Sequence, residues 1–165
     1  MAFACQLDSP LGPIILTEED GALRSLRFVG QRYFPDCLPP LVDPASKPIF
    51  AETADWLSCY FSGAVPKQMP ALRPEGTPFR LVVWDLLREI PYGGTRSYGE
   101  LADMLEARLG RHVSARAVGG AVGHNPISLL IPCHRVVGAD GSLTGYAGGL
   151  ERKRRLLDLE QGKPL

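Results

Sequence analysis

Cys133 and His134 are neighbours in the sequence and directly follow an apolar run, Ile127–Ile131, and Pro132. A free thiol with a pKa of about 8.5 is only a few per cent thiolate at neutral pH, so a nucleophilic cysteine needs a nearby base. Histidine is suited to that task because its pKa lies near neutrality. The pair therefore predicts an activated thiol at the end of a buried strand. A structural cysteine beside a buried histidine is the alternative.

A carboxylate near the C-terminus favours the activated thiol. The segment Leu150–Glu160 is predicted to be a helix, with Leu156 and Leu157 on its core-facing side. Glu160 projects between these two leucines, and a carboxylate is costly to bury without a partner. A histidine whose other nitrogen serves a thiol is such a partner. Lys153 projects in nearly the same direction, so a plain surface Lys–Glu pair is the alternative.

The segment Ala115–Gly123 predicts a helix, capped by Ser114, with two distinct faces. The core-facing side holds Ala115, Val118, Ala121 and Val122, and the opposite side holds Arg116, Gly119, Gly120 and Gly123. Each glycine in an exposed helix costs roughly 1 kcal/mol relative to alanine. Bare backbone lets a partner approach closely, and Arg116 is the only large side chain on that side. We interpret this side as a contact for a nucleic-acid backbone; close helix–helix packing is the alternative.

The elements around these residues predict a helix-turn-helix in the second half of the chain. Thr77 and Pro78 have the pattern of an N-cap and first helical residue, and the apolar stripe that follows reaches Ile90 before Pro91. Ser97–Glu100 is a capping box that opens the next helix, and a short turn around residues 110–113 leads to Ser114. An ordinary helix pair would give the same pattern.

The first half of the chain predicts a small sheet and one helix. Short strands are expected at residues 2–7, 14–17 and 22–29. Prolines place a loop at 35–48, a helical apolar pattern covers 49–61, and a proline-rich linker covers 65–76. The sequence therefore predicts an α+β fold with an N-terminal domain at 1–74 and a C-terminal domain at 75–165.

Composition narrows the classes of function. The 18 basic and 18 acidic side chains cancel, which excludes a general basic DNA-coating protein and leaves only local, directed contact with nucleic acid. No apolar run is long enough for a membrane span, and the N-terminus lacks a signal-peptide pattern, so we expect a cytoplasmic protein, nuclear in a eukaryote. We expect no cofactor, no metal site and no structural disulfides among Cys5, Cys37, Cys59 and Cys133.

The segment Ile131–Val136, which reads IPCHRV, resembles the active-site motif of the O6-alkylguanine-DNA alkyltransferases, the methylated-DNA–protein-cysteine S-methyltransferases. The resemblance covers Thr77–Glu160 closely and the segment around Asp8–Gly12 more loosely. It extends in order through Ser97-Tyr98, Ala115–Gly119, Gly123 with Asn125-Pro126, Gly145–Gly149, and Leu156-Leu157 with Glu160.

The resemblance implies both fold and activity. It implies a ribonuclease-H-like N-terminal domain of sheet and helix, followed by a helical domain whose helix-turn-helix binds the minor groove of double-stranded DNA. The implied reaction is a single-turnover transfer of the alkyl group from O6-alkylguanine to Cys133, after the base has left the stack. It implies a monomer that needs no cofactor and no membrane. Whether O4-alkylthymine is also a substrate stays open.

The resemblance implies five catalytic residues. Cys133 accepts the alkyl group, His134 acts as a base toward the thiol through a water, and Glu160 orients and charges His134. Tyr98 assists base extrusion and donates toward the ring as guanine leaves. Asn125 holds the turn that links the recognition helix to the cysteine.

The resemblance also implies the residues that hold DNA. Arg116 fills the gap left by the flipped nucleotide, and further DNA contacts are expected from Ser97, Tyr98, Ala115, Gly119, Gly120, Gly123 and Arg135. The flipped base is expected to meet Cys133, Val136, Tyr146, Ala147 and Gly148. One departure concerns Met104–Val113, which is longer than expected for the family and lies in or near the turn of the helix-turn-helix.

Two other functions fit part of the pattern. A cysteine hydrolase with a Cys-His-Glu triad predicts repeated turnover, and the glycine-rich loop Gly138–Gly149 permits the oxyanion donor that it needs. The arginine and glycines of Ala115–Gly123 argue against it. A non-enzymatic lesion-binding relative or a transcription regulator is the second alternative. Alkyltransferase-like binding proteins typically carry tryptophan where Cys133 stands, so the cysteine favours transfer chemistry.

Overall fold

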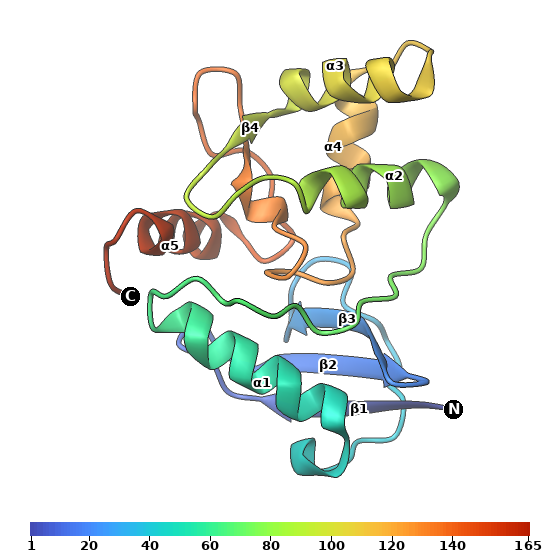
Figure 1. The fold of residues 1–165 in the computed structure, drawn as a ribbon, viewed down its shortest axis with the longest axis vertical. Helices are drawn as coiled ribbons and strands as arrows, with labels where there is room; N and C mark the ends of the chain where they lie inside the picture. The colour runs from blue at the N-terminus through green and yellow to red at the C-terminus, as the bar shows by residue number, and fades with distance from the viewer.

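A three-stranded antiparallel sheet forms one end of the molecule (Figure 1). In this computed structural model, which describes residues 1–165, its strands are β1 (Ala2–Leu7), β2 (Ile14–Glu19) and β3 (Ala22–Phe28), in the order β1-β2-β3. The hairpin between β2 and β3 turns through Asp20 and Gly21, both with positive φ, of 52° and 76°. All three predicted strands are confirmed, and β2 continues to Glu19.

Helix α1 (Pro48–Phe61) covers this sheet, after a short 3₁₀ turn, η1 (Pro44–Ser46). Its buried side has the expected helical spacing and consists of Ile49, Phe50, Thr53, Trp56, Leu57 and Tyr60. The proline-rich segment that follows has no helix or strand, and it meets β3 through a bridge between Leu23 and Leu72 and an ion pair between Arg24 and Glu75. The predicted helix is therefore confirmed, and the segment expected as a linker has neither helix nor strand.

Three helices form the other end of the molecule: α2 (Pro78–Leu87), α3 (Tyr98–Leu109) and α4 (Ala115–Gly123). Thr77, Ser97 and Ser114 cap them, because each side-chain oxygen accepts the N–H three residues further on. The expected continuation of α2 to Ile90 is wrong. The N–H groups of Glu89 and Ile90 bond the carbonyls three residues back, which tightens the chain into a turn before Pro91.

The residues of the long segment Met104–Val113 partly extend α3 and partly form the turn before α4. Helix α3 runs to Leu109 and ends at Gly110 with φ 66°. The turn is then tied back to α3, since the carboxylate of Glu106 accepts the N–H of Val113 at 3.0 Å. Helix α4 packs on α2, and the indole of Trp84 donates to the carbonyl of Ala121 at 2.8 Å. Of the four residues expected on the core side of α4, Ala115 is instead exposed.

The strand expected at Ile127–Ile131 is wrong, although the segment is buried. Its backbone has one bridge, with Leu26 of β3, and no strand ladder. The N–H of Ile131 bonds the carbonyl of Ile127, and Leu129 has a positive φ of 72°. These are the features of a turn. An apolar run of this length fits a buried turn as well as a buried strand, and the sequence pattern does not separate them.

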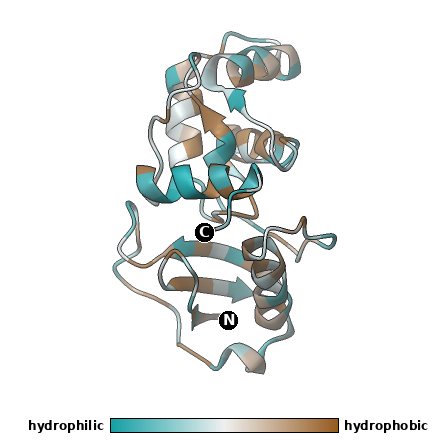
Figure 2. Ribbon diagram, turned by 90° about the vertical axis from the view of Figure 1, so that its left-hand side faces the viewer, coloured by the Kyte–Doolittle hydropathy of each residue, from teal (hydrophilic) through white to brown (hydrophobic).

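The segment after this turn positions the cysteine. Cys133–Arg135 forms a single 3₁₀ turn, η2, and leads into the short strand β5 (Val136–Val137), which pairs in parallel with β4 (Arg96–Ser97). Helix α5 (Leu150–Glu160) ends the fold and contacts η2. Figure 2 is viewed from the α5 side and shows polar and apolar residues alternating along this helix, as expected for one that buries a single side.

A continuous hydrophobic core joins the two ends of the molecule. Its buried residues come from the sheet, from α1 and from every helix of the other end. The α+β fold is confirmed, whereas a division at 74/75 stays a prediction. No helix is long and apolar enough to cross a bilayer.

Candidate active site

Cys133 lies at a pocket of about 350 Å³ between α4, the loop before α5 and the loop after β3. The side chain is buried, with 4% of the residue exposed. The structure brings Cys133 together with most of the residues expected around a DNA base. The lining consists of Arg32, Tyr33, Tyr98, Arg116, Gly119, Gly120, Val122, Gly123, His124, Cys133, Gly145, Tyr146 and Ala147.

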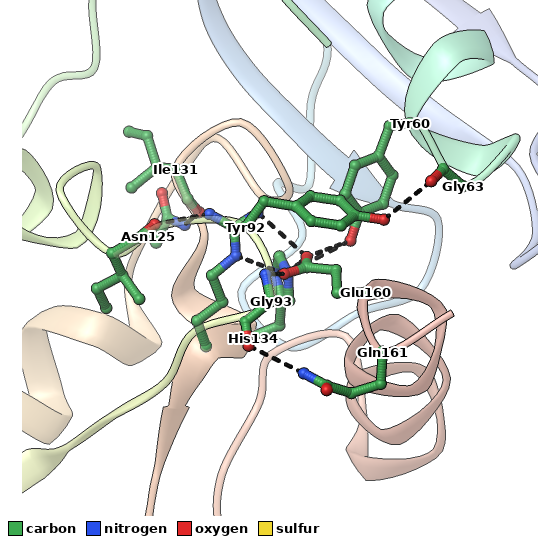
Figure 3. A network of polar contacts seen from close by, with 11 residues as sticks. Tyr60, Gly63, Tyr92, Gly93, Asn125, Ile131, His134, Glu160 and Gln161 are labelled. Carbon is green, nitrogen blue, oxygen red and sulfur yellow. Dashed lines mark hydrogen bonds and ion pairs between the residues drawn. The ribbon is translucent and has the colours of Figure 1, made fainter. Parts of the chain in front are cut away.

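His134 and Glu160 form a buried pair behind the cysteine (Figure 3). Nε2 of His134 lies 2.6 Å from Oε2 of Glu160, and both side chains are almost fully buried. The carboxylate is held by further donors: Oε1 accepts the N–H of Gly93 at 2.9 Å and Nε of Arg135 at 2.8 Å. Glu160, which the sequence places on the core side of its helix, therefore reaches the histidine beside the candidate nucleophile.

The charge state of this pair follows from its surroundings. Burial would raise the pKa of Glu160, but the hydrogen bonds from His134, Arg135 and Tyr60 outweigh it and lower the pKa to about 2. Burial lowers the pKa of His134, so the neutral ring is favoured. With Nε2 donating to the carboxylate, the lone pair of the neutral ring lies on Nδ1, which is buried and has no protein partner. Nδ1 is thus the nitrogen that is free to accept a proton.

The thiol of Cys133 is a protonated group at rest. Burial raises its pKa to about 11, although a hydrogen bond from Asn125 and the charge of Lys153 act in the opposite direction. Such a thiol is a poor nucleophile at neutral pH until a base takes its proton. The neighbouring residue His134, with its neutral ring and unpartnered Nδ1, is the candidate base.

Asn125 fixes the turn that delivers the cysteine. Its Nδ2 donates to the carbonyl of Ile131 at 2.8 Å, and its Oδ1 accepts the N–H of Ile127 at 3.0 Å. Both bonds are buried and both close the segment between α4 and Cys133. The structural part of the role expected for Asn125, that it holds this turn, agrees with these contacts.

The glycine side of α4 is open. A Cβ added to Gly120 or Gly123 would meet no atom within 4 Å, and one on Gly119 would only touch the ring of Tyr98 at 3.9 Å. Packing against another helix, the alternative reading of these glycines, is therefore wrong for this structure. Arg116 is exposed on the same side, and none of the ion pairs of the chain involves it.

Two tyrosines form the pocket walls. The hydroxyl of Tyr98 donates to the carbonyl of Thr144 at 2.9 Å, and burial raises its pKa, so it remains a proton donor. The hydroxyl of Tyr146 is buried without a protein partner. Gly148, expected in the base pocket, does not line it: a Cβ there would come within 2.6 Å of the Tyr146 ring. Gly148 instead leaves the space in which Tyr146 packs.

Arg135 was expected to bind DNA, and the structure contradicts this. The side chain is buried, pairs with Glu160, and donates from Nη1 to the carbonyl of Ile90 at 2.8 Å. A guanidinium with these partners has no free donor fork for a phosphate. Among the other expected contacts, the side chain of Ser97 is used as the cap of α3.

Lys153 is not a surface partner of Glu160, so that alternative is also wrong. It is fully buried, and its ammonium donates to the carbonyls of Val136, Thr144 and Gly145. Val136, expected to meet the base through its backbone, thus has its carbonyl engaged by α5, and its N–H bonds the carbonyl of Cys133.

Sequence reasoning missed the part of the pocket that comes from the N-terminal half. The ring of Tyr33 stacks on His124 of the helix end, with centroids 4.2 Å apart, and the guanidinium of Arg32 lies 4.9 Å from the Tyr33 ring. The N–H of Arg32 bonds the carbonyl of Ala147 at 3.0 Å. Tyr33 has a φ of 63°, a conformation that non-glycine residues rarely adopt. In the sequence, the only local sign of this contribution is the adjacent pair Arg32 and Tyr33 in a loop.

These features define a class of protein: a helix-turn-helix chain that presents a buried cysteine, with a histidine–glutamate pair, at a pocket beside its exposed helix. Comparison with known families identifies it more closely. The ribonuclease-like domain of 6-O-methylguanine DNA methyltransferase matches residues 5–69, and the DNA binding domain of the same family matches residues 78–162. The chain belongs to the 6-O-methylguanine DNA methyltransferase family.

Individual relatives agree along nearly the whole chain. A methylated-DNA–protein-cysteine methyltransferase of Mycobacterium tuberculosis is 46% identical over 157 residues, which cover 95% of this chain and 91% of the relative. One of Methanosarcina acetivorans is 42% identical over 153 residues, covering 93% and 94%. The structure of a Mycobacterium tuberculosis OGT in complex with DNA is similar with a TM-score of 0.85 at 44% identity, covering 98% of this chain and 95% of that one.

Proposed function

We propose that this chain repairs DNA by moving the alkyl group of O6-alkylguanine onto Sγ of Cys133, once per molecule. The observation that carries the proposal is the position of Cys133. Its thiol lies at a pocket that is bounded by the open glycine side of α4 and backed by the His134–Glu160 pair. The relatives named as methylated-DNA–protein-cysteine methyltransferases support the same reaction.

Side chains at the pocket account for the proton and the electron pairs that move in this reaction. The proton of the Cys133 thiol passes toward Nδ1 of His134, and Glu160 stabilises the charge that the ring gains. The sulfur forms a bond to the saturated carbon, the bond from that carbon to O6 breaks, and its electron pair stays with guanine. Tyr98, which lines the pocket and whose hydroxyl stays protonated, is the proposed donor to the leaving base.

The pocket also determines how the substrate must be presented. A saturated carbon on O6 of a stacked base cannot be reached in line by a buried side chain, so the nucleotide must leave the duplex. We propose that α4 lies in the minor groove of double-stranded DNA, with Arg116 filling the vacated position and Gly119, Gly120 and Gly123 allowing close approach. Ala115, exposed in the first turn, belongs to the same surface.

Several expectations accompany this proposal. Tyr146 and Ala147 form the wall that meets O6, and the protein works as a monomer. Because its substrate is DNA, the proposed place of work is the compartment that holds the chromosome. The N-terminal domain is proposed to end near residue 74, within the segment that has neither helix nor strand.

Mass spectrometry of the intact protein tests the reaction. After incubation with excess duplex DNA containing O6-methylguanine, one methyl-sized mass gain per molecule is expected, on the peptide that contains Cys133. Cys133→Ser is the control that should show no gain and still bind DNA. Sustained release of repaired DNA, many times the amount of protein, would mean that Cys133 is regenerated, which is what a cysteine hydrolase requires.

A further inference from the structure

Tyr60 brings the N-terminal half of the chain to the catalytic pair. It lies in the last turn of α1, whereas His134 follows α4 and Glu160 ends α5. Figure 3 shows its hydroxyl pointing at the Glu160 carboxylate. The Tyr60 hydroxyl donates to Oε2 of Glu160 at 2.7 Å, across 100 residues of sequence, and lies 3.4 Å from Nε2 of His134.

The two oxygens of Glu160 have different surroundings. Oε1 is held by the backbone of Gly93 and by Nε of Arg135. Oε2 is the oxygen that faces His134, and it accepts from the Tyr60 hydroxyl and, at 3.2 Å, from Nη2 of Arg135. The tyrosine therefore acts on the oxygen that orients the histidine, and its donation draws negative charge from the contact with Nε2.

The Tyr60 ring is held firmly enough to fix this geometry. It is fully buried and stacks on Trp56, with centroids 5.3 Å apart and planes 7° apart. Edge contacts from Phe61, Tyr92 and His134 surround it. Burial and the nearby Glu160 charge raise the pKa of Tyr60 far above its ordinary value, so the hydroxyl is a donor at neutral pH.

We propose that Tyr60 is a positioning residue for alkyl transfer, which holds Oε2 of Glu160 against Nε2 of His134 so that Nδ1 stays unprotonated and available as the base. This inference rests on the proposed function. It assigns the N-terminal half a part in the chemistry, in addition to its share of the core. Second partners of this kind set the orientation and proton affinity of a histidine in the way that outer ligands do in metal sites.

Tyr60→Phe removes only the hydroxyl, and Tyr92→Phe is its matched control. Tyr92 lies in the same aromatic cluster, but its hydroxyl points to the carbonyl of Gly63, at 3.4 Å. We expect Tyr60→Phe to slow single-turnover transfer from duplex O6-methylguanine roughly tenfold, which corresponds to about one charge-assisted hydrogen bond. DNA affinity, measured in the Cys133→Ser background, stays within twofold. Tyr92→Phe should match the parent in both.

The pH profile separates positioning from support of the fold. Without the hydroxyl, the Glu160 carboxylate becomes more basic and favours protonated His134, so the pKa of His134 rises. The acidic limb of the transfer rate should then move to higher pH in Tyr60→Phe. A role in folding alone would lower the rate equally at every pH. In a Glu160→Gln background, the Tyr60→Phe change should cost nothing further, because both act through the same carboxylate.

Nitrogen NMR of the His134 ring gives a readout that needs no substrate. Tyr60→Phe should shift the Nε2 resonance and raise the ring's titration midpoint, whereas Tyr92→Phe should change neither. If the parent transfers methyl and Tyr60→Phe equals it in rate, pH limb and ring resonance, the inference is overturned and the proposed function stands. If the parent fails to transfer, the proposed function is overturned, and the ring resonances alone still decide whether Tyr60 acts on His134.

Discussion

The ammonium group of Lys153 lies in the interior of the molecule and donates to the carbonyl of Val136, three residues after the cysteine. The same group donates to the carbonyls of Thr144 and Gly145, in the loop that borders the pocket. A single side chain of α5 thus ties the cysteine segment to the pocket loop. Lys153→Met keeps the length of the side chain and removes these bonds.

We expect Lys153→Met to lower the free energy of unfolding by about 1–3 kcal/mol, since the buried Val136 carbonyl loses its donor. Urea denaturation measures this loss. Lys163→Met is the control, because Lys163 is exposed and its nearest carboxylate, on Asp158, is 3.9 Å away. Equal stability of the two variants would show that the interior contacts of Lys153 contribute nothing to the fold.

The same lysine predicts a dependence of stability on pH. Burial lowers the pKa of Lys153 to about 8 from its ordinary value of 10.5, so the unfolded chain binds this proton more tightly. Between pH 8 and 10.5 the unfolded state carries more protons, and stability rises with pH. The difference in unfolding free energy between the parent and Lys153→Met should therefore grow across this window and stay constant below it. A difference that shrinks above pH 8 would contradict the lowered pKa.

The resting state of Cys133 is open to a direct test. Because burial raises its pKa to about 11, the thiolate fraction at neutral pH is roughly 100-fold smaller than in the unfolded chain. Reaction with iodoacetamide, followed on the Cys133 peptide, should rise about tenfold per pH unit to pH 10 without levelling. In urea it should begin to level near pH 9. A native plateau below pH 9 would mean that the thiolate is already present before any DNA arrives.

Local signals predicted most of the fold. The caps at Thr77, Ser97 and Ser114 depend on residues within a few positions, and each is in the structure as expected. The open glycine side of α4 also followed from helical periodicity alone. These features need no knowledge of the rest of the chain.

The predictions that failed concern features that depend on partners far away in the sequence. Ile127–Ile131 is a turn because Asn125 and one bridge to β3 take up its backbone groups. Arg135 is interior because Glu160 and the carbonyl of Ile90 accept its donors. In the sequence, Tyr60 looks like any other apolar position of the α1 helix. Its buried hydroxyl bonds a partner 100 residues away, and the local pattern gives no sign of that contact.

The glycines of α4 predict a trade between stability and function. A Cβ added to Gly120 would meet no atom within 4 Å, and the φ of Gly120 is not positive, so Gly120→Ala introduces no strain. The substitution should stabilise the helix by up to about 1 kcal/mol. The added methyl group projects into the surface proposed to meet DNA. We expect a higher unfolding temperature together with weaker binding and slower transfer. Gly120→Ala that gains stability and loses no DNA affinity would place the groove contact elsewhere.

Arg116 is exposed on the glycine side of α4 and lines the pocket that holds Cys133. Extrusion of a nucleotide costs a few kcal/mol, and a side chain that fills the vacancy offsets part of this. Arg116→Ala should therefore slow repair of duplex DNA tenfold or more. Reaction with a free O6-alkylated guanine base needs no extrusion and should keep its rate, because Cys133, His134 and Glu160 are unchanged.

The ratio of the duplex rate to the free-base rate of Arg116→Ala decides whether Arg116 replaces the flipped nucleotide. Arg116→Lys keeps the charge and should recover part of the duplex rate if phosphate attraction contributes, but not all of it, since lysine lacks the planar group that stacks between bases. If the duplex and free-base rates fall equally, Arg116 supports the pocket and does not replace the flipped base. If neither falls, α4 is not the helix that faces the lesion, and the open glycine side has another use.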